Sequence, residues 1–329
     1  MKAAQFSYFG SPLEVIELEE VPDPPSPGDG EVGIDIMYVP VNVGDLLAME
    51  GRYGASAFKL PRIAGVEGLG RISSVGENVN NVQVGDRVLL PPGHGTWCEK
   101  ITAPAAQVTV LPDKGDAQQL CMMRANPASA YMMLTTFVDL SPGDWVIQNA
   151  ANSGVGQYLI ELAKLEGFKT VNIVRRPRTV EPLKQLGADV VLLDGADLQE
   201  RVTAETGGAS IKLGIDAVAG DASQKMAQCL AVGGTIVNYG LLSGKPCKIE
   251  PSEVIFRDIR LRGFWRAKWQ ITAPPEEVSR VTEHLVSHIV HGKLRSEIEA
   301  VYPFWKLREA LHHAQHSDRV GKILLQMSE

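Results

Sequence analysis

The pattern of apolar and polar positions divides the chain into two kinds of region. In the first 115 or so residues, short β-like runs near 32–39, 70–76 and 86–90 are separated by turns rich in Gly and Pro. Short runs punctuated in this way predict an irregular, mostly β domain. From about residue 118, apolar strand-like runs alternate with segments of helical periodicity. Such alternation predicts a parallel sheet with helices on both faces.

The alternating region begins with a predicted helical stretch over 117–138 and a turn at 141–144. Strands are then predicted near 146–149, 171–174, 189–193, 213–218 and 235–240, with helices over 154–166, 179–186, 197–205 and 222–231 between them. A helix over 276–291, a further β-like run and a last helix follow, and we expect them to return to the first domain. The predicted division is therefore 1–117 with 268–329 for one domain and 118–267 for the other.

The segment 146–157 reads V-I-Q-N-A-A-N-S-G-V-G-Q, an apolar strand that runs into a turn of small residues and then a helix. Aligned on its last glycine, it has Ala151 and Ser153 at the first two glycine positions of the dinucleotide fingerprint G-x-G-x-x-G, and only Gly156 matches. Small residues still allow the pyrophosphate to approach the N–H groups at the helix start. The alternative is a tight strand–turn–helix crossing without a ligand.

The next predicted strand ends in a cluster of arginines, because 171–178 reads V-N-I-V-R-R-P-R. An NAD site usually has Asp or Glu about 20 residues after the glycine turn, to bind the ribose 2′-hydroxyl. Arg175 occupies that place, and Arg176 and Arg178 follow it. Guanidinium groups bind a 2′-phosphate that a carboxylate would repel, so the sequence favours NADPH over NADH. A solvated basic loop is the alternative interpretation.

Composition narrows the classes of function. The 329 residues are 44% hydrophobic and 22% charged, as in ordinary globular proteins, and the net charge of −7 argues against nucleic-acid binding. No stretch is apolar for the roughly 18 residues that a membrane span needs, and no basic-then-apolar leader is found at the start. The four cysteines are scattered, which argues against a structural zinc site or disulfides. We therefore expect a cytoplasmic protein without nucleic-acid or membrane partners.

Motifs spread over nearly the whole chain resemble the medium-chain dehydrogenase/reductase superfamily. They are Gly65-Val-Glu-Gly-Leu-Gly70, Val84-Gly-Asp-Arg-Val88, the turn at 151–156 and Leu186-Gly-Ala-Asp189. Others are similar to its 2-enoyl thioester reductase branch, the enoyl-CoA or enoyl-acyl-carrier-protein reductases of mitochondrial type. These are Asn42-Val-Gly-Asp45, Gly51-Arg-Tyr-Gly54, Asn126-Pro-Ala-Ser-Ala-Tyr131, Gln148-Asn-Ala-Ala-Asn-Ser-Gly-Val-Gly156, Tyr239-Gly240 and Leu261-Arg-Gly-Phe-Trp265.

The resemblance implies an α/β fold in which a doubly wound, Rossmann parallel sheet accompanies a mostly β, GroES-like catalytic domain. It implies an oxidoreductase of fatty acid metabolism that uses NADPH to reduce the C=C bond of a 2-enoyl thioester or a related activated alkene, and that forms a homodimer. A quinone reductase or a 2-alkenal or small-acrylate reductase on the same scaffold is the alternative. A catalytically silent NADPH-binding protein is an alternative from a different class.

The resemblance also implies that the reaction is independent of zinc. Zinc alcohol dehydrogenases of this superfamily need a Cys and a His in segments where this chain has Val43 and Val66, and valine cannot bind a metal. A proton donor must then be a side chain, and the resemblance assigns this catalytic role to Tyr53 in G-R-Y-G. A phenol is protonated near neutral pH and can donate a proton to the substrate.

The resemblance further implies contacts to the cofactor along the chain. The expected cofactor-binding residues are Asn126, Asn152, Ser153, Gly154, Val155, Arg175, Arg176, Arg178, Tyr239, Gly240, Leu241, Leu242, Phe264, Trp265, Arg266, Ala267 and Lys322. Core packing for Phe264 and Trp265, and a surface position for Lys322, are the alternatives.

Three arginines depart from the pattern of the resembled branch. If Arg52, Arg124 or Arg266 faces the substrate, a carboxylate or phosphate would suit the site better than a long acyl tail. The alternative is that they face solvent or pair with neighbouring acids.

Overall fold

A computed structural model describes residues 1–54, 59–316 and 318–327, and these form two compact units. The first unit contains Met1–Ala125, Val286–Gly292 and Ser296–Glu329, and the second contains Asn126–Leu285 and Lys293–Arg295. The predicted boundaries lay at 117 and 268. Residues 118–125 join the first unit because the Gln119 side chain exchanges two hydrogen bonds of 2.9 Å with the backbone of Ser296.

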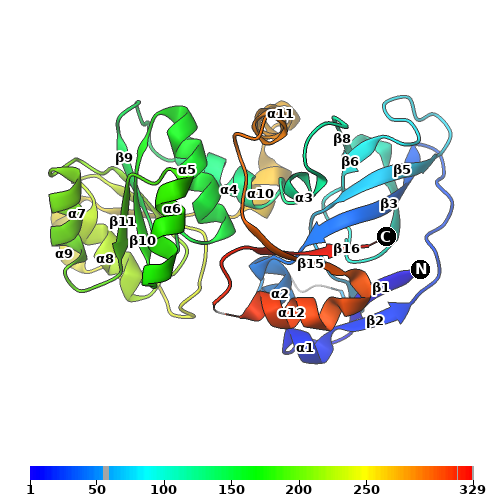
Figure 1. Cartoon of the computed structure of the whole chain (residues 1–329), viewed down its shortest axis with the longest axis horizontal. Helices are drawn as coiled ribbons and strands as arrows, with labels where there is room; N and C mark the ends of the chain where they lie inside the picture. Colours follow the sequence, from blue (N-terminus) through cyan, green and yellow to red (C-terminus); the bar gives the residue numbers. More distant parts are fainter. Residues whose placement is uncertain (55–58, 317, 328–329) are drawn as a thin grey trace. The chain divides into compact units, whose positions relative to one another are not determined.

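The first unit is mostly antiparallel β structure (Figure 1). A seven-stranded sheet has the order β15-β16-β3-β5-β6-β8, with β7 paired to β3, and a three-stranded sheet has the order β2-β1-β4. Its elements are β1 (Lys2–Phe6), α1 (Pro12–Val15), β2 (Glu17–Glu20), β3 (Glu31–Pro40), α2 (Val43–Met49), β4 (Arg62–Ile63), β5 (Leu69–Val75), β6 (Arg87–Leu89), β7 (Lys100–Pro104), η1 (Ala105–Gln107), β8 (Thr109–Leu111), α3 (Ala117–Leu120), β15 (Ile298–Pro303), η3 (Phe304–Lys306), α12 (Leu307–Gln315) and β16 (Lys322–Gln326). The three strands predicted near 32–39, 70–76 and 86–90 are confirmed as β3, β5 and β6.

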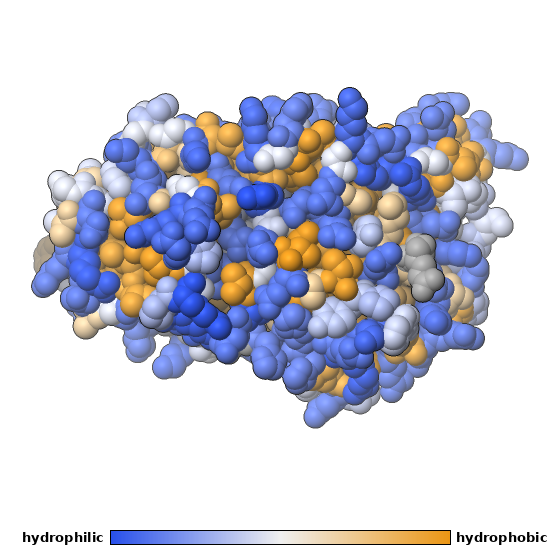
Figure 2. Space-filling view, viewed as in Figure 1, coloured by the Kyte–Doolittle hydropathy of each residue, from blue (hydrophilic) through white to orange (hydrophobic). Residues whose placement is uncertain are grey.

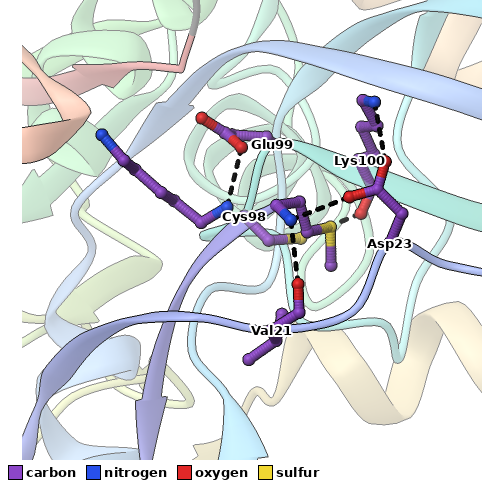
Figure 3. Close-up of polar contacts among 7 residues, drawn as sticks. Val21, Asp23, Cys98, Glu99 and Lys100 are labelled. Carbon is purple, nitrogen blue, oxygen red and sulfur yellow. Dashed lines mark hydrogen bonds and ion pairs between the residues drawn. The ribbon is translucent and has the colours of Figure 1, made fainter.

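Polar contacts hold the start of β1 against neighbouring segments of the first unit (Figure 3). The amino group of Met1 donates to the Val21 carbonyl and to Asp23 Oδ1, each at 2.8 Å. Lys100 Nζ lies 2.9 Å from Asp23 Oδ2, so Asp23 meets two cations. Hydrogen bonds from these cations lower the pKa of Asp23 to about 2. The carboxylate is thus charged at neutral pH, and it ties the strands β1 and β7 together through side chains as well as the backbone.

The second unit is a six-stranded parallel sheet with helices, and this confirms the predicted doubly wound fold. The strand order is β11-β10-β9-β12-β13-β14. Its elements are α4 (Asn126–Thr135), β9 (Trp145–Gln148), α5 (Gly154–Glu166), β10 (Lys169–Val174), η2 (Pro177–Thr179), α6 (Val180–Leu186), β11 (Val190–Leu193), α7 (Leu198–Thr206), β12 (Leu213–Asp216), α8 (Asp221–Cys229), β13 (Thr235–Asn238), α9 (Pro251–Arg257), β14 (Arg260–Gly263), α10 (Arg266–Thr272) and α11 (Pro275–Val290), whose last turn belongs to the first unit.

Two local differences from the sequence analysis have physical causes. The helical stretch expected over 117–138 is broken into α3 and α4 by turns at 121–125. Pro127 has no N–H to donate to a carbonyl of the preceding turn, and proline is tolerated only in the first turn of a helix, so α4 begins anew at Asn126 instead of continuing α3. The short helix α10 was not predicted, because its seven residues have no fully buried side chain and hence no apolar periodicity.

Figure 2 shows the face of the molecule that is seen in Figure 1. Polar residues cover much of this face, and apolar patches lie between them. Among the described residues, no helix is long and apolar enough to cross a membrane.

Candidate functional site

The turn between β9 and α5 in the second unit has the geometry expected of an anion-binding turn. Ser153 is the N-cap of α5, and its side chain accepts a hydrogen bond of 3.2 Å from the Gly156 N–H. Ala150 has a positive φ of 48°, an uncommon conformation for a residue with a side chain. The N–H groups of the first helical turn and the positive end of the helix dipole are suited to a phosphate.

Gly156 is required at this turn by packing. A Cβ at this position would lie 2.4 Å from the Ala151 carbonyl oxygen, which is closer than real Cβ atoms come to backbone. The missing side chain therefore lets the first turn of α5 lie directly against the turn that precedes it. This explains why Gly156 is the one fingerprint glycine kept, while Ala151 and Ser153 replace the other two.

The arginine cluster lies beside this turn, because β9 and β10 are neighbouring parallel strands in which Gln148 pairs with Asn172. The Ala151 N–H donates to the Ile173 carbonyl at 3.3 Å, two residues before Arg175. In the described parts of the chain, the exposed Arg175 has no hydrogen-bond or ion-pair partner. A guanidinium so placed is available to an anion bound at the turn.

Arg176 and Arg178 are arranged differently from Arg175. The carbonyl of Arg176 accepts hydrogen bonds from the Thr179 N–H at 3.1 Å and from the Thr179 hydroxyl at 2.8 Å, which close the short helix η2. Arg178 lies within η2 and is exposed. Arg176 is half-buried and its carbonyl helps to form the loop, whereas Arg175 is exposed. The two arginines therefore have different environments.

Sequence reasoning missed a layer of buried amides beneath the turn. Gln148 Nε2 donates to the Gly156 carbonyl at 2.9 Å and to Asn172 Oδ1 at 2.7 Å. Asn172 Nδ2 continues the chain of hydrogen bonds to the Val190 carbonyl at 3.0 Å. These amides connect three strands to the start of α5. The signal was a polar residue inside each of two apolar strands, V-I-Q-N and V-N-I-V.

A second tight turn follows β13, where Tyr239 and Gly240 were predicted to border the cofactor. A Cβ on Gly240 would lie 2.5 Å from the Ala217 carbonyl oxygen, so a glycine is needed here as well. The Tyr239 hydroxyl shares a hydrogen bond with the Ser153 side chain, and burial raises the pKa of Tyr239 above its ordinary value. This hydrogen bond brings together the turn before α5 and the turn after β13. The sequence analysis predicted cofactor contacts for both turns but did not predict that they meet. Leu241 and Leu242, next along the chain, are exposed.

Asp216 is the residue that organises this part of the unit, and sequence reasoning missed it. Its buried carboxylate accepts hydrogen bonds of 2.6 Å from Asn149 Nδ2 and of 2.6 Å from the Ser223 hydroxyl. The N–H groups of Val218 and Ala219 donate to the same carboxylate at 2.8 and 3.0 Å. Asp216 thus fixes the ends of β9 and β12 together. An Asp that ends an apolar strand was the available signal.

The remaining residues of the second unit predicted to bind the cofactor lie at element ends. Phe264 follows β14 and packs edge-on against Phe137, with ring centroids 6.2 Å apart. Trp265 is 42% exposed at the start of α10, and Arg266, next to Ala267, donates to Gln270. Asn126 begins α4, Asn152 lies in the turn before α5, and Gly154 and Val155 are the first two residues of α5. Phe264 is thus packed by an aromatic neighbour, whereas Trp265 is partly exposed.

The first unit places Lys322 in its interior rather than at a surface. The side chain is 5% exposed, and its ammonium donates to the Val41 carbonyl at 3.3 Å and to Asn42 Oδ1. Burial lowers the pKa of Lys322 to about 8. Two of the three N–H groups of the Lys322 ammonium therefore donate to residues just before α2. The sequence analysis did not predict these contacts.

Two buried carboxylates complete this cluster. The Asn42 N–H donates to Asp45 Oδ2 at 2.8 Å, and Asn42 Nδ2 donates to Glu67 Oε1 at 2.8 Å. Glu67 Oε2 also accepts from the Ala125 N–H at 2.7 Å. Burial raises the pKa of Asp45 to about 7, the nearby Glu67 carboxylate contributing in the same direction. The ammonium of Lys322 offsets the negative charge of this cluster, which holds the start of α2 in place.

Tyr53 follows α2 on the same unit and is half-buried. Its ring packs close to Gly44, where an added Cβ would come within 3.2 Å of Tyr53 Cε2. Arg52 is exposed and pairs with Glu50 at 2.7 Å, so its charge is partly neutralised. Among the three arginines that depart from the pattern, Arg52 therefore has an acid beside it, Arg266 has an amide, and Arg124 is half-buried.

The sequence of this chain is similar to two known domain families and to curated proteins. Residues 28–123 match the alcohol dehydrogenase GroES-like domain, and residues 154–287 match the family described as zinc-binding dehydrogenase. The mitochondrial enoyl-[acyl-carrier-protein] reductase of Rattus norvegicus is 33% identical over 321 residues, which cover 94% of this chain and 84% of the rat protein.

Two solved structures illustrate the range of relatives. A Bacillus thuringiensis protein described as an NADPH:quinone reductase has a TM-score of 0.90 and is 28% identical, with 99% of each chain covered. The complex of Etr1p with NADP and crotonyl-CoA has a TM-score of 0.87 and is 25% identical, again with 99% of each chain covered. Etr1p also occurs in a heterodimer described as the mitochondrial 2-enoyl thioester reductase of Candida tropicalis.

Proposed function

The chain belongs to the medium-chain dehydrogenase/reductase superfamily as an NAD(P)H-dependent reductase, and we propose that it reduces the C=C bond of a 2-enoyl thioester with NADPH. The observation that carries the proposal is the turn at 149–156 with Arg175 exposed beside it. The names of its curated relatives support an enoyl thioester as the acceptor.

We infer that NADPH binds the second unit through residues that the fold brings together. The N–H groups at the start of α5 would hold the pyrophosphate, and Arg175 would bind the 2′-phosphate through charge-assisted hydrogen bonds. Ser153, held by Tyr239, would orient the turn for this contact. When bound, the cofactor supplies the hydride that reduces the β carbon of the alkene.

The proposed role of the first unit is to deliver the proton. Hydride addition at the β carbon leaves an enolate, whose α carbon must then be protonated. We propose that the Tyr53 hydroxyl provides this proton. The buried cluster of Asn42, Asp45 and Lys322 supports the proposal, because it fixes the start of the helix that leads to Tyr53.

The site is proposed to work without a catalytic zinc ion. Val43 and Val66 stand where zinc alcohol dehydrogenases of the superfamily have Cys and His, and neither aliphatic side chain has an atom that can coordinate a metal. A side-chain acid is then the simplest source of the proton.

A quinone reductase is the second candidate, and the Bacillus thuringiensis relative favours it. The experiment is a comparison of NADPH oxidation by the purified chain with crotonyl-CoA, benzoquinone and a small acrylate or 2-alkenal. We expect the highest kcat/KM with crotonyl-CoA. A clear preference for benzoquinone would replace the proposal by the second candidate, and no oxidation with any acceptor would indicate a silent NADPH-binding protein.

We also propose that the protein is a homodimer. In the second unit, β14 is the last strand in the order of the six-stranded sheet, and within the described residues it pairs with β13 alone. On α9, which precedes β14 in the chain, Ile255 is 68% exposed and Phe256 is 79% exposed. An open strand edge next to exposed apolar side chains is suited to a second copy of the same edge.

A further inference from the structure

The outer face of α12 carries a histidine pair that the proposed reductase chemistry does not use. The inner face of this helix packs into the core of the first unit through Leu307, Ala310, Leu311 and Ala314. Residues at i, i+3 and i+7 share one face of a helix, which places Glu309, His312 and His316 together on the outside. His312 and His316 are both exposed, so their imidazoles are accessible to a ligand.

The two imidazoles are spaced as ligands of one metal ion. Their ring centroids lie 5.2 Å apart, and the ring planes are inclined by 50°. Bonds of about 2.0–2.1 Å from two imidazole nitrogens to a tetrahedral zinc ion place the ring centroids roughly 5 Å apart. Histidines at i and i+4 on one helical face are an established zinc-binding pattern. The observed separation of the two rings is therefore the one that two imidazoles have when they bind the same ion.

Within the described residues, no side-chain hydrogen bond or ion pair engages the ring of His312 or of His316, whereas the ring of His313 is engaged. A surface cavity of about 600 Å³ is lined by His312, His316, Glu309 and Arg308, together with Tyr302 and His313. His313 has both ring nitrogens occupied, by Glu299 Oε1 at 2.9 Å and by the Tyr302 hydroxyl at 3.0 Å. The guanidinium of Arg308 donates to the carbonyl of Leu13 in α1, the helix that lies beside α12 in Figure 1.

We propose that His312 and His316 bind one divalent transition-metal ion of the Zn²⁺, Ni²⁺ or Cu²⁺ class, with water completing the coordination. Among residues 1–54, 59–316 and 318–327, no group of three or more His, Cys, Asp or Glu side chains is arranged for a metal. The site is accordingly a two-imidazole site, open on its outer side. Neutral imidazole is a preferred ligand for these metals, and Cu²⁺ binds such ligands more tightly than Ni²⁺ or Zn²⁺ does.

The bound ion would stabilise the end of α12. His316 is the C-cap of the helix, so a metal that joins it to His312 closes the last helical turn. Glu299 holds the following residues by accepting hydrogen bonds from the N–H groups of Val320 and Gly321 at 2.6 and 2.9 Å. The metal would thus add a link between side chains to the backbone hydrogen bond of 3.0 Å that the His316 N–H donates to the His313 carbonyl.

The test is calorimetric titration of the untagged, full-length protein with ZnCl₂ and with CuCl₂. We expect one ion per chain, a rise in Tm on addition of either metal, and loss of affinity by roughly tenfold or more in His312→Gln and in His316→Gln. His291→Gln is the matched control, because His291 is also exposed but lies on the segment after α11, where its Nδ1 donates to the Ser287 carbonyl at 2.7 Å. The control variant should bind Zn²⁺ like the wild type.

Three results would overturn the proposal: absence of one-to-one binding at millimolar metal, binding that persists in the double variant His312→Gln/His316→Gln, and equal loss in His291→Gln. Circular dichroism of each variant shows whether the fold is kept, and these exposed positions should leave it intact. NADPH oxidation measured in parallel separates this site from the proposed reductase activity, since neither histidine belongs to that machinery.

Discussion

At the residue scale, the exposed Arg175 is the side chain on which coenzyme preference is proposed to depend. It follows β10 directly, and the turn at 149–153 reaches the end of that strand through the hydrogen bond between Ala151 and Ile173. The neighbouring Arg176 and Arg178 are set in a short helical loop, so the three arginines of the sequence are not equivalent in the fold.

Arg175→Ala should lower kcat/KM for NADPH by roughly tenfold to a hundredfold, because charge-assisted hydrogen bonds to the 2′-phosphate are lost. The value for NADH should change little, since this coenzyme has no phosphate at that position. Steady-state kinetics with both coenzymes measures the ratio, and NADH serves as the internal control. An equal loss for both coenzymes, or a wild-type preference for NADH, would contradict the proposed role.

Tyr53→Phe should keep the affinity for NADPH and reduce kcat by roughly a hundredfold or more, since general acid catalysis typically contributes that much. The substitution removes only the hydroxyl, and the ring can keep its packing near Gly44. Fluorescence titration of the coenzyme and turnover with crotonyl-CoA separate the two effects. Full turnover in the variant would exclude Tyr53 as the proton donor.

Asp45 gives a prediction about stability and pH. Burial raises the pKa of Asp45 from 3.8 to about 7, so the unfolded chain releases this proton at a lower pH than the folded one. Stability is therefore lost as the pH rises from about 4 to about 7, by roughly 1.4 kcal/mol per pH unit for one proton. Asp45→Asn lacks this loss, and its amide oxygen can still accept the hydrogen bond from the Asn42 N–H.

Urea unfolding of the wild type and of Asp45→Asn at pH 5.0 and at pH 7.0 measures this difference. We expect the variant to gain about 2 kcal/mol relative to the wild type between the two values. This window lies below the pKa of about 8 to which burial lowers Lys322, so that group does not titrate within it. A difference in stability that is independent of pH would show that Asp45 ionises normally in the folded protein.

At the scale of elements, the contact between β9, its turn and α5 is the feature on which the proposed dinucleotide site depends. Helix α5 begins with its backbone against the Ala151 carbonyl, and Gln148 reaches from β9 to the Gly156 carbonyl at 2.9 Å. One set of close contacts thus holds the strand, the turn and the first turn of the helix together. These contacts leave no room for a side chain at Gly156.

Gly156→Ala should destabilise the protein by roughly 2 kcal/mol or more and abolish NADPH binding, because its Cβ would meet backbone atoms that cannot move aside independently. Gly28→Ala in the first unit is the control, since φ is not positive there and an added Cβ would approach only the end of the Glu31 side chain, at 3.3 Å. Thermal unfolding and coenzyme titration of both variants give the comparison. If Gly156→Ala bound NADPH normally, the tight crossing would not be needed for the site.

At the scale of the whole molecule, the exposed edge β14 and the apolar side chains of α9 are the features that predict assembly. Phe256→Glu should convert the dimer to a monomer, since a charge in an apolar interface is costly to desolvate. Ile271→Glu is the matched control, because Ile271 is 82% exposed on α10 in the same unit and lies outside the proposed interface. Size-exclusion chromatography with light scattering measures the mass, and a monomeric wild type would contradict the proposal.

The sequence by itself determined the classes of element and the superfamily. Apolar runs of period two, helical periodicity and glycine turns are local properties, so β3, β5, β6 and the alternation from β9 to β13 could be predicted from neighbouring residues. The turn at 151–156 and the arginines after β10 could also be found, because each is a short run of neighbouring residues with a recognisable composition.

Only the tertiary structure decided which distant side chains meet. The bond between Ser153 and Tyr239, the Asp216 carboxylate beneath the turn, and the insertion of Lys322 beside Asn42 join residues that are many positions apart. A buried lysine and a surface lysine have the same sequence signal, and a polar residue in an apolar strand does not indicate its partner. Burial and hydrogen bonding are properties of the packed chain, and they assign these residues their roles.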